Sequence, residues 1–100
     1  QINPKFAPVI NNLALVTAAN QEYYKALTIF SDVLNYWPDD AKTHYNIACM
    51  YSRLNREQES IEWLQKAIDK GYANWESIKS DSDLDNIRDA DAYKELVKGH

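Results

Sequence analysis

The chain has 100 residues, of which 45% are hydrophobic and 26% charged, as in an ordinary single globular domain. Only two glycines and three prolines are present, which argues against a turn-rich β fold and favours helices. The net charge of -4 and the pI near 5.0 argue against a nucleic acid or an anionic membrane as the partner, because either would require a basic face.

The first predicted elements are two helices at about residues 5–19 and 22–36, with a polar turn at Asn20 between them. Apolar residues recur at steps of three and four in both segments, which is the period of a helix with one buried face. A short turn of this kind joins antiparallel helices. The periodic residues are Ile10, Leu13, Val16 and Thr17 in the first segment and Leu27, Phe30, Val33 and Leu34 in the second.

A second pair of helices is predicted at about residues 40–54 and 57–70, with a turn at Asn55. Asp39 or Asp40 can cap the first of these helices, and Gly71 follows the second as a left-handed stop. The same period recurs in the last segment, at Ile61, Leu64, Ala67 and Ile68.

Two prolines, Pro4 and Pro38, are separated by one full period of a helical-hairpin repeat, and Pro38 sets a frame that begins one repeat at Ala7 and the next at Ala41. Small residues stand where the two helices of each hairpin would cross, and larger apolar residues are expected to fill the space beside them. The small residues are Ala14, Ala26, Ala48 and Ser60, and the larger ones are Leu13, Phe30, Ile47 and Leu64.

The spacing within this frame resembles the W-x2-L-G-x2-Y, A-x3-F, P signature of the tetratricopeptide repeat, with two identities changed in the second repeat. The resemblance implies an all-α fold, a right-handed α-α superhelix of about two hairpins with short C-terminal capping helices. The first repeat reads Ile10, Leu13, Ala14, Thr17, Ala26, Phe30, Val33 and Pro38, and the second reads His44, Ile47, Ala48, Tyr51, Ser60, Leu64, Ala67 and Tyr72.

On this interpretation the chain is a single domain in four parts. Residues 1–6 end a preceding repeat, residues 7–40 and 41–74 are two repeats, and residues 75–100 are a capping tail. Because Pro4 takes the place of Pro38 one period earlier, we expect the chain to be part of a longer protein. The first helix should then present an unfinished apolar surface that includes Phe6 and Val9.

The tail is similar to those that close many bacterial tetratricopeptide arrays, and we expect it to cover the last hairpin while its acids face solvent. Residues 81–100 hold six acids and three bases, a net charge of -3. Three short helices are predicted there, around Trp75 and Ile78, around Leu84 and Ile87, and at Tyr93, Leu96 and Val97 after Asp89 or Asp91.

In the tetratricopeptide family the first helix of each hairpin lines a concave groove that holds a partner. Carried onto this sequence, the resemblance implies a mixture of apolar, aromatic and cationic side chains, which suits an extended or helical peptide with some negative charge. The implied groove residues are Asn11, Leu15, Ala18, Lys42, Tyr45, Asn46, Cys49, Ser52 and Arg53, flanked by Pro8 and Ala19.

Two more specific binding sites are disfavoured by the residues present. The family's carboxylate clamp for chaperone C-termini would keep only Asn46, which we therefore expect to bond within the array; Asn11, Leu15, Glu76 and Ser80 replace the other four clamp residues. A calcium loop that starts at Asp81 would have Asn86 in place of the turn glycine and Ala92 in place of the bidentate glutamate, so we expect helix caps and solvated turns instead.

Catalytic and metal chemistry also lack the residues they need. His44 and His100 are the only imidazoles, and Cys49, as the single thiol, excludes an internal disulfide and a multi-cysteine metal site. We expect His44 to be a packed or half-exposed structural histidine and Cys49 to be a buried or bystander thiol, and we expect no cofactor, no metal and no enzymatic activity. No apolar run approaches the roughly 20 residues that span a bilayer, so we expect no membrane insertion; the compartment stays open, with the cytoplasm slightly favoured.

The leading hypothesis is a non-enzymatic adaptor segment that binds a protein or peptide in its groove, and not a nucleic acid. One alternative is a structural role, in which the N-terminal helix mediates self-association into a homo-oligomer. Another is a regulatory appendage of a larger protein that includes an enzyme.

Overall fold

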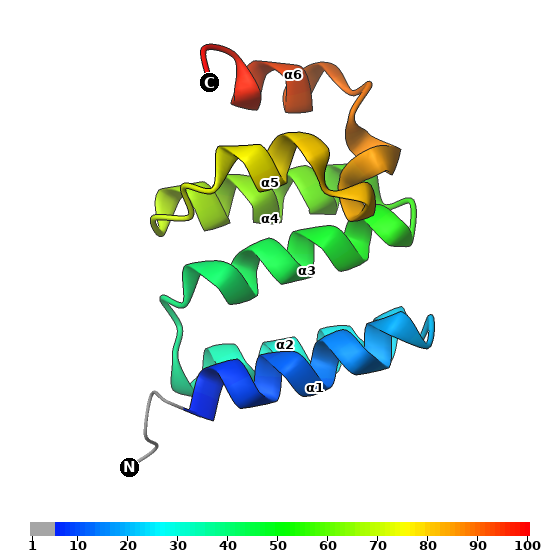
Figure 1. Ribbon diagram of the computed structural model, residues 1–100, viewed down its shortest axis with the longest axis vertical. Helices are drawn as coiled ribbons and strands as arrows, with labels where there is room; N and C mark the ends of the chain where they lie inside the picture. Colours follow the sequence, from blue (N-terminus) through cyan, green and yellow to red (C-terminus); the bar gives the residue numbers. More distant parts are fainter. Residues whose placement is uncertain (1–5) are drawn as a thin grey trace.

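The computed structural model describes residues 6–100, which are helical and contain no strand. The helices stack one above another from the N-terminal to the C-terminal end of an elongated molecule (Figure 1). The elements are α1 (Ala7–Ala19), α2 (Tyr23–Tyr36), α3 (Ala41–Arg53), α4 (Glu57–Asp69), α5 (Trp75–Ser80), the 3-10 helix η2 (Ser82–Ile87) and α6 (Asp91–Val97). The all-α fold of successive helical hairpins predicted from the sequence is confirmed, and each of the four long helices begins and ends within two residues of its predicted bounds.

The two turns inside the hairpins have the same backbone geometry. Gln21 has φ 65° and Asn55 has φ 58°, and these two positions are one repeat period apart. The left-handed residue of the first turn is therefore Gln21, whereas the predicted turn residue, Asn20, has φ -86°. Gly71 has φ 108° and follows α4 as predicted, because glycine adopts this conformation without the steric penalty that a Cβ brings.

Helix α3 begins at a side-chain cap. Of the two predicted candidates, Asp40 is the N-cap, and its carboxylate accepts a hydrogen bond of 3.1 Å from the Thr43 amide. Its neighbour Asp39 instead accepts a bond of 2.6 Å from Lys70 Nζ, which ties the start of α3 to the end of α4. His44 is buried, as expected of a structural histidine, and its Nδ1 donates to the Asp40 carbonyl at 2.9 Å.

Small residues lie where the helices of each hairpin cross, as predicted. Ala14, Ala26, Ala48 and Ser60 are fully buried, and the Ser60 hydroxyl donates to the Ala48 carbonyl at 2.7 Å. The crossing in the second hairpin therefore carries a hydrogen bond as well as close backbone packing.

The larger core residues also follow the prediction, with one exception. Phe30, Ile47 and Leu64 are buried, but Leu13 is exposed, so the prediction that it fills the hairpin interior is wrong. Ile47, one period later, packs in the core beside α2, which precedes α3, whereas among the described residues no helix precedes α1 to cover Leu13.

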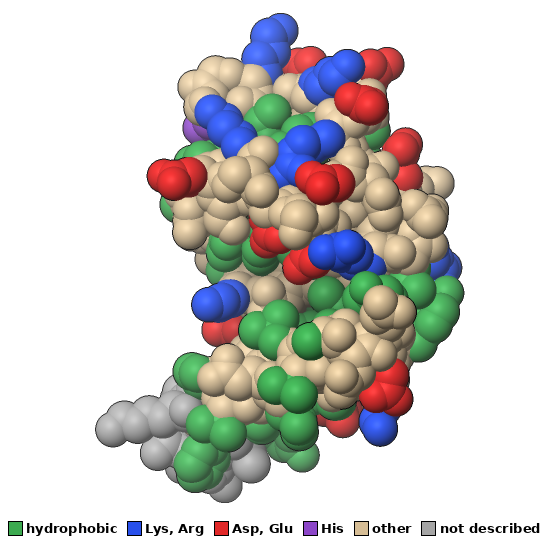
Figure 2. Space-filling model, turned by 45° about the vertical axis from the view of Figure 1, so that its right-hand side comes forward, with side chains coloured by type: hydrophobic (Ala, Val, Ile, Leu, Met, Phe, Trp, Pro, Cys, Tyr) green, Lys and Arg blue, Asp and Glu red, His purple; other side chains and the backbone are tan. Residues whose placement is uncertain are grey.

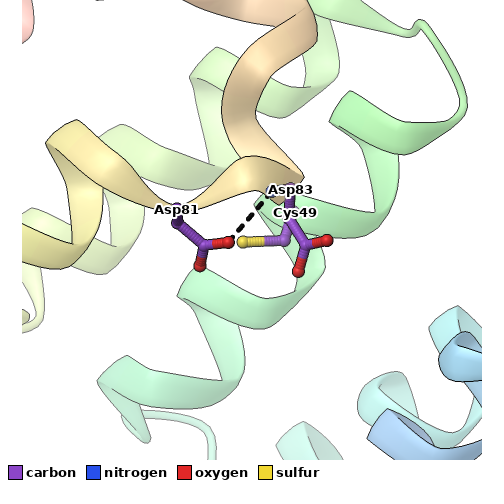
Figure 3. Close-up of side chains that lie close together, drawn as sticks. All are labelled: Cys49, Asp81 and Asp83. Atoms are coloured by element: carbon purple, nitrogen blue, oxygen red, sulfur yellow. Dashed lines mark hydrogen bonds between the residues drawn. The ribbon is translucent and has the colours of Figure 1, made fainter.

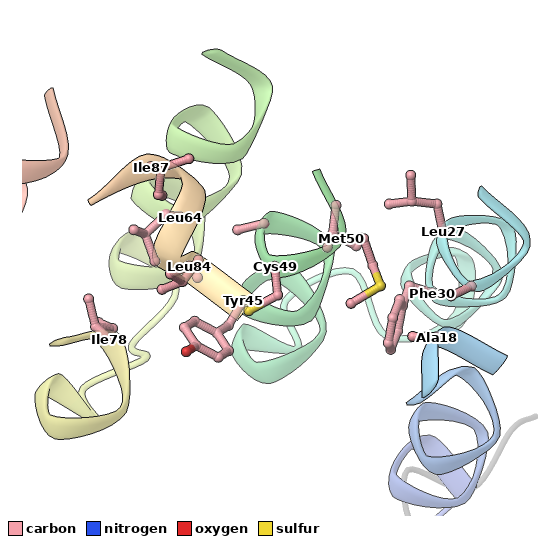
Figure 4. Packing of buried hydrophobic residues seen from close by; sticks show 14 of the residues in the cluster. Ala18, Leu27, Phe30, Tyr45, Cys49, Met50, Leu64, Ile78, Leu84 and Ile87 are labelled. Atoms are coloured by element: carbon pink, nitrogen blue, oxygen red, sulfur yellow. The ribbon is translucent and has the colours of Figure 1, made fainter. Parts of the chain in front are cut away.

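The tail covers the last hairpin with apolar side chains. Ile78, Leu84 and Ile87 are fully buried and lie with Leu64 in one cluster (Figure 4). The Tyr93 hydroxyl donates to the Ile78 carbonyl at 2.9 Å, which ties α6 to α5. The predicted capping role is thus supported by a continuous core from α3 to α6.

Candidate functional site

An open cleft lies between α1 and α3. It contains two adjoining pockets, of about 170 Å³ and 360 Å³, which share Leu15 as a wall. The smaller pocket has Asn11 and Lys42 at its sides, and the larger one has Ala18 and Arg53. The structure therefore brings five of the predicted groove residues together around one cleft.

The tail covers the neighbouring part of the concave face. Tyr45 is buried there, and its hydroxyl donates to Asp81 Oδ2 at 2.7 Å while lying 3.1 Å from Ser77 Oγ. The ring of Tyr72 stacks on the Tyr45 ring with centroids 4.2 Å apart and planes inclined by 8°. Burial is the main reason that the pKa of Tyr45 lies well above its usual range, so the phenol stays protonated.

Two aspartates of the tail, Asp81 and Asp83, are half-buried and accept hydrogen bonds from protein donors. Asp83 accepts a hydrogen bond of 2.7 Å from Arg53 Nε, and its own amide donates to Asp81 Oδ1 at 2.9 Å. The expectation that the tail turns its acids outward is wrong for this pair, because Tyr45 and Arg53 provide donors on the face that η2 covers. The hydrogen bond that Arg53 donates to Asp83 also raises the pKa of Arg53, whose charge is thus already paired.

Ser52 and Asn46 are buried as well. Asn86 Nδ2 donates to the Ser52 carbonyl at 2.9 Å, which places η2 over this turn of α3. The buried amide nitrogen of Asn46 has no hydrogen-bond partner among the described residues, contrary to the expectation that it bonds within the array. A buried donor without a partner is a cost to the folded state.

The Cys49 sulfur lies between the side chains of Asp81 and Asp83 in Figure 3. One potential ligand atom from each of Cys49, Asp81 and Asp83 lies within 4.8 Å of the others. Both carboxylates already accept hydrogen bonds from protein donors, and burial followed by the nearby charges of Asp81 and Asp83 raises the pKa of the thiol. The thiol is therefore protonated at neutral pH, whereas a cysteine nucleophile reacts as the thiolate.

Several residues of the open cleft escaped the sequence analysis. Tyr23, Gln21 and Met50 line the larger pocket together with Asp83 of the tail. Tyr23 begins the second helix of its hairpin and Asp83 belongs to the tail, whereas the resemblance implied groove residues only on the first helix of each hairpin. The spacing of Met50 from Asn46 and Arg53, by four and three residues, is the signal that could have identified it.

Helix length and hydropathy also bear on the membrane. Within residues 6–100, the structure has no helix that is both long enough and apolar enough to cross a bilayer.

Comparisons with known proteins agree with the repeat spacing and the stacked hairpins. The sequence profile of the tetratricopeptide repeat matches residues 6–70. Over 82 residues the chain is 35% identical to a chloroplastic protein of Arabidopsis thaliana; the aligned part is 79% of this chain and 24% of that protein. The chain thus spans about a quarter of that relative, whose name refers to the chloroplast and lends no support to the cytoplasm in particular. The chain belongs to the tetratricopeptide repeat family.

Proposed function

We propose that this chain is a non-enzymatic module that binds a peptide segment of a partner protein in the cleft between α1 and α3. Tetratricopeptide repeats generally act as protein-protein interaction modules, and the family is typically non-enzymatic. The observation that carries the proposal is the pair of adjoining pockets at Leu15, which stay open although the tail covers the rest of the concave face.

The chemistry of the cleft favours an apolar anchor over an acidic one. The larger pocket has apolar and aromatic walls at Leu15, Ala18 and Tyr23 and polar groups at Gln21, Arg53 and Asp83. This lining suits one large aliphatic or aromatic side chain whose neighbouring peptide groups can form hydrogen bonds. Arg53 is already paired with Asp83 and offers less to a carboxylate than the sequence suggested. We therefore expect a peptide whose affinity comes mainly from the buried side chain.

Polar groups can orient the backbone of such a peptide. Asn46 lies on α3 midway between Lys42 of the smaller pocket and Met50 of the larger one, four residues from each and on the same side of the helix. The side-chain amide nitrogen of Asn46 has no hydrogen-bond partner among the described residues. Rotation about the Cβ–Cγ bond would turn this N–H group toward the cleft, where a peptide carbonyl could accept its hydrogen bond. Lys42 is exposed and would favour an acidic residue at that end of the peptide.

The pKa directions support a binding role over a catalytic one. Burial raises the pKa of both Cys49 and Tyr45, so the two most nucleophilic groups near the cleft stay protonated. An activated nucleophile needs the opposite shift or an adjacent base. A role as the regulatory appendage of a larger protein uses the same cleft and is compatible with this proposal.

The test is a selection of short random peptides displayed on phage against the immobilised 100-residue chain, followed by affinity measurements on the enriched peptides. We expect a shared large apolar residue and a loss of at least roughly tenfold in affinity in Ala19→Trp, which fills the larger pocket, and in Lys42→Glu. Both residues are exposed, so the fold should survive. Lys66→Glu, an exposed cation on α4, is the matched control and should leave affinity unchanged. Peptides that bind Ala19→Trp and Lys42→Glu as tightly as the parent chain would refute the assignment of the cleft.

A further inference from the structure

A second cleft lies between α4 and α6, at the end of the molecule that carries the tail (Figure 1). It shares no lining residue with the cleft between α1 and α3. Its volume is about 1130 Å³, whereas pockets that enclose a small molecule usually measure about 300 to 1,000 Å³. The cleft therefore has room for several side chains of a macromolecular partner.

The walls of this cleft carry apolar side chains at helical spacing. Ile61 and Ile68 lie on one face of α4, about two turns or roughly 10 Å apart, and Leu96 belongs to the α6 side. All three are half-buried and pack against the core. Trp75 forms another part of the wall, where its ring stacks on the His100 imidazole with centroids 3.6 Å apart and planes inclined by 6°. An apolar wall of this length suits the apolar face of a docked helix.

The charges at the cleft are mainly acidic. Glu62 of α4 and Glu95 of α6 both line it and are exposed, and neither forms an ion pair with any residue in the described part of the chain. Lys66, which also lines the cleft, holds its ammonium group over the Trp63 ring, 4.3 Å from the centroid. Each of the two helices therefore brings an acid that a cation of the partner can pair with.

The surface around the tail has the same mixed character. Figure 2 shows Lys, Arg, Asp and Glu side chains gathered over the upper part of the molecule, with hydrophobic side chains between them. The chain as a whole carries a net charge of -4, which adds a general attraction for a basic segment.

We propose that the cleft between α4 and α6 binds an amphipathic helix of a partner protein. The apolar stripe of that helix lies between α4 and α6, and Lys or Arg residues along its edges pair with Glu62 and Glu95. This surface is separate from the cleft between α1 and α3, so the chain would hold a second segment independently of the first.

Two other occupants fit the cleft less well. In a two-fold contact between copies of this chain the same patch faces itself, which would bring Glu62 and Glu95 of one copy toward the same acids of the other. A small apolar molecule would leave both carboxylates without a cationic partner.

The test is a selection of phage-displayed helical peptides of roughly four turns against the Ala19→Trp chain, in which the cleft at Leu15 is filled. We expect enriched peptides to have apolar residues at helical spacing with Lys or Arg beside them. In the same background, Ala92→Trp, which fills the new cleft, should weaken their binding at least roughly tenfold, and Glu62→Lys and Glu95→Lys should each weaken it roughly fivefold. All three residues are exposed, so the fold should survive.

Asp32→Lys is the matched control, because Asp32 is an exposed acid on α2 that lies outside the cleft. It makes the same change in net charge as Glu95→Lys and should leave affinity unchanged. Failure to enrich any peptide, enriched peptides without Lys or Arg, or binding that survives Ala92→Trp would overturn the proposal. Equal weakening by Asp32→Lys and Glu95→Lys would also overturn it, because only net charge would then matter. So would a dimer in sedimentation velocity that Ala92→Trp abolishes, because the occupant would then be a second copy.

Discussion

The contact between the tail and α3 makes a quantitative prediction about the reactivity of Cys49. Leu84 of η2 is fully buried in the cluster that holds the tail against the last hairpin, and Cys49 is buried under Asp81 and Asp83 of the same tail. Truncation of a buried leucine to alanine costs about 2 to 5 kcal/mol. If the tail must open before the thiol is reached, Leu84→Ala stabilises the open state relative to the closed one by that amount.

The expected effect on rate follows from the opening equilibrium. When the tail recloses faster than the thiol reacts, the labelling rate is proportional to the population of the open state. A cost of about 2 kcal/mol raises that population about 30-fold, since about 1.4 kcal/mol corresponds to a factor of ten. We therefore expect Cys49 in Leu84→Ala to react at least about 30 times faster than in the parent chain.

The assay is the second-order reaction of the single thiol with a chromogenic disulfide reagent, at a fixed pH so that the thiolate fraction of the open state is the same in both chains. Phe30→Leu is the control, because Phe30 is fully buried beside Met50 in the first hairpin, away from the tail. This change weakens the whole fold without altering the contact between the tail and α3. Circular dichroism would confirm that both variants remain helical.

Two results would refute the reasoning. A parent-like labelling rate in Leu84→Ala would mean that the tail does not limit access to Cys49. Equal acceleration in Leu84→Ala and Phe30→Leu would mean that the thiol is reached by unfolding of the whole chain and that the tail has no separate opening.

Three further predictions concern single positions. Gly71→Ala should lower the free energy of unfolding by about 1 kcal/mol in urea titrations. Gly71 has φ 108°, and a Cβ added there would meet no atom within 4 Å, so the cost comes from backbone strain alone. An unchanged midpoint would contradict this. Asp40→Ala should lower the free energy of unfolding by about 0.5 to 2 kcal/mol, because α3 loses its N-cap. Asp39→Ala breaks only an exposed ion pair with Lys70 and should lower it by less. The reverse order would be inconsistent with Asp40 as the cap. Burial raises the pKa of Tyr45 above its ordinary value of 10.0, so above about pH 10 the unfolded chain releases a proton that the folded chain keeps and stability falls. Tyr45→Phe should lose about 1 kcal/mol at neutral pH with the bond to Asp81, and its stability should decline less than that of the parent chain between pH 8 and pH 11 or so; an equal decline would count against the assignment.

The features that were predictable are those decided within a few residues. The extent of each helix follows from the apolar period, and its ends follow from residues that act on nearby backbone. Asp40 begins α3 as its N-cap, and Gly71 follows the end of α4 at φ 108°. Gln21 escaped because a left-handed glutamine has no strong compositional signal, and only its alignment with Asn55 at one repeat period shows that the turns are equivalent.

The candidate site was predictable only along α1 and α3. The family resemblance implied Leu15, Ala18 and Arg53, which do line the open cleft. The resemblance also implied Tyr45 and Cys49, which the tail covers. A repeat position indicates which face of a helix a residue occupies, but it does not indicate which other segment packs against that face.

The sequence by itself therefore determined the family and the order of the hairpins, since the repeat period and the local backbone preferences depend on residues that are close together in the chain. Only the tertiary structure decided which part of the concave face is open. That depends on contacts between residues far apart in the chain, such as Tyr45 with Asp81 and Arg53 with Asp83, whose partners no local pattern marks. The tertiary structure also shows that Leu13 is exposed and Ile47 is buried, although the two residues occupy the same position in the repeat. Burial at this position depends on whether a neighbouring helix packs against it, and not on the residue itself.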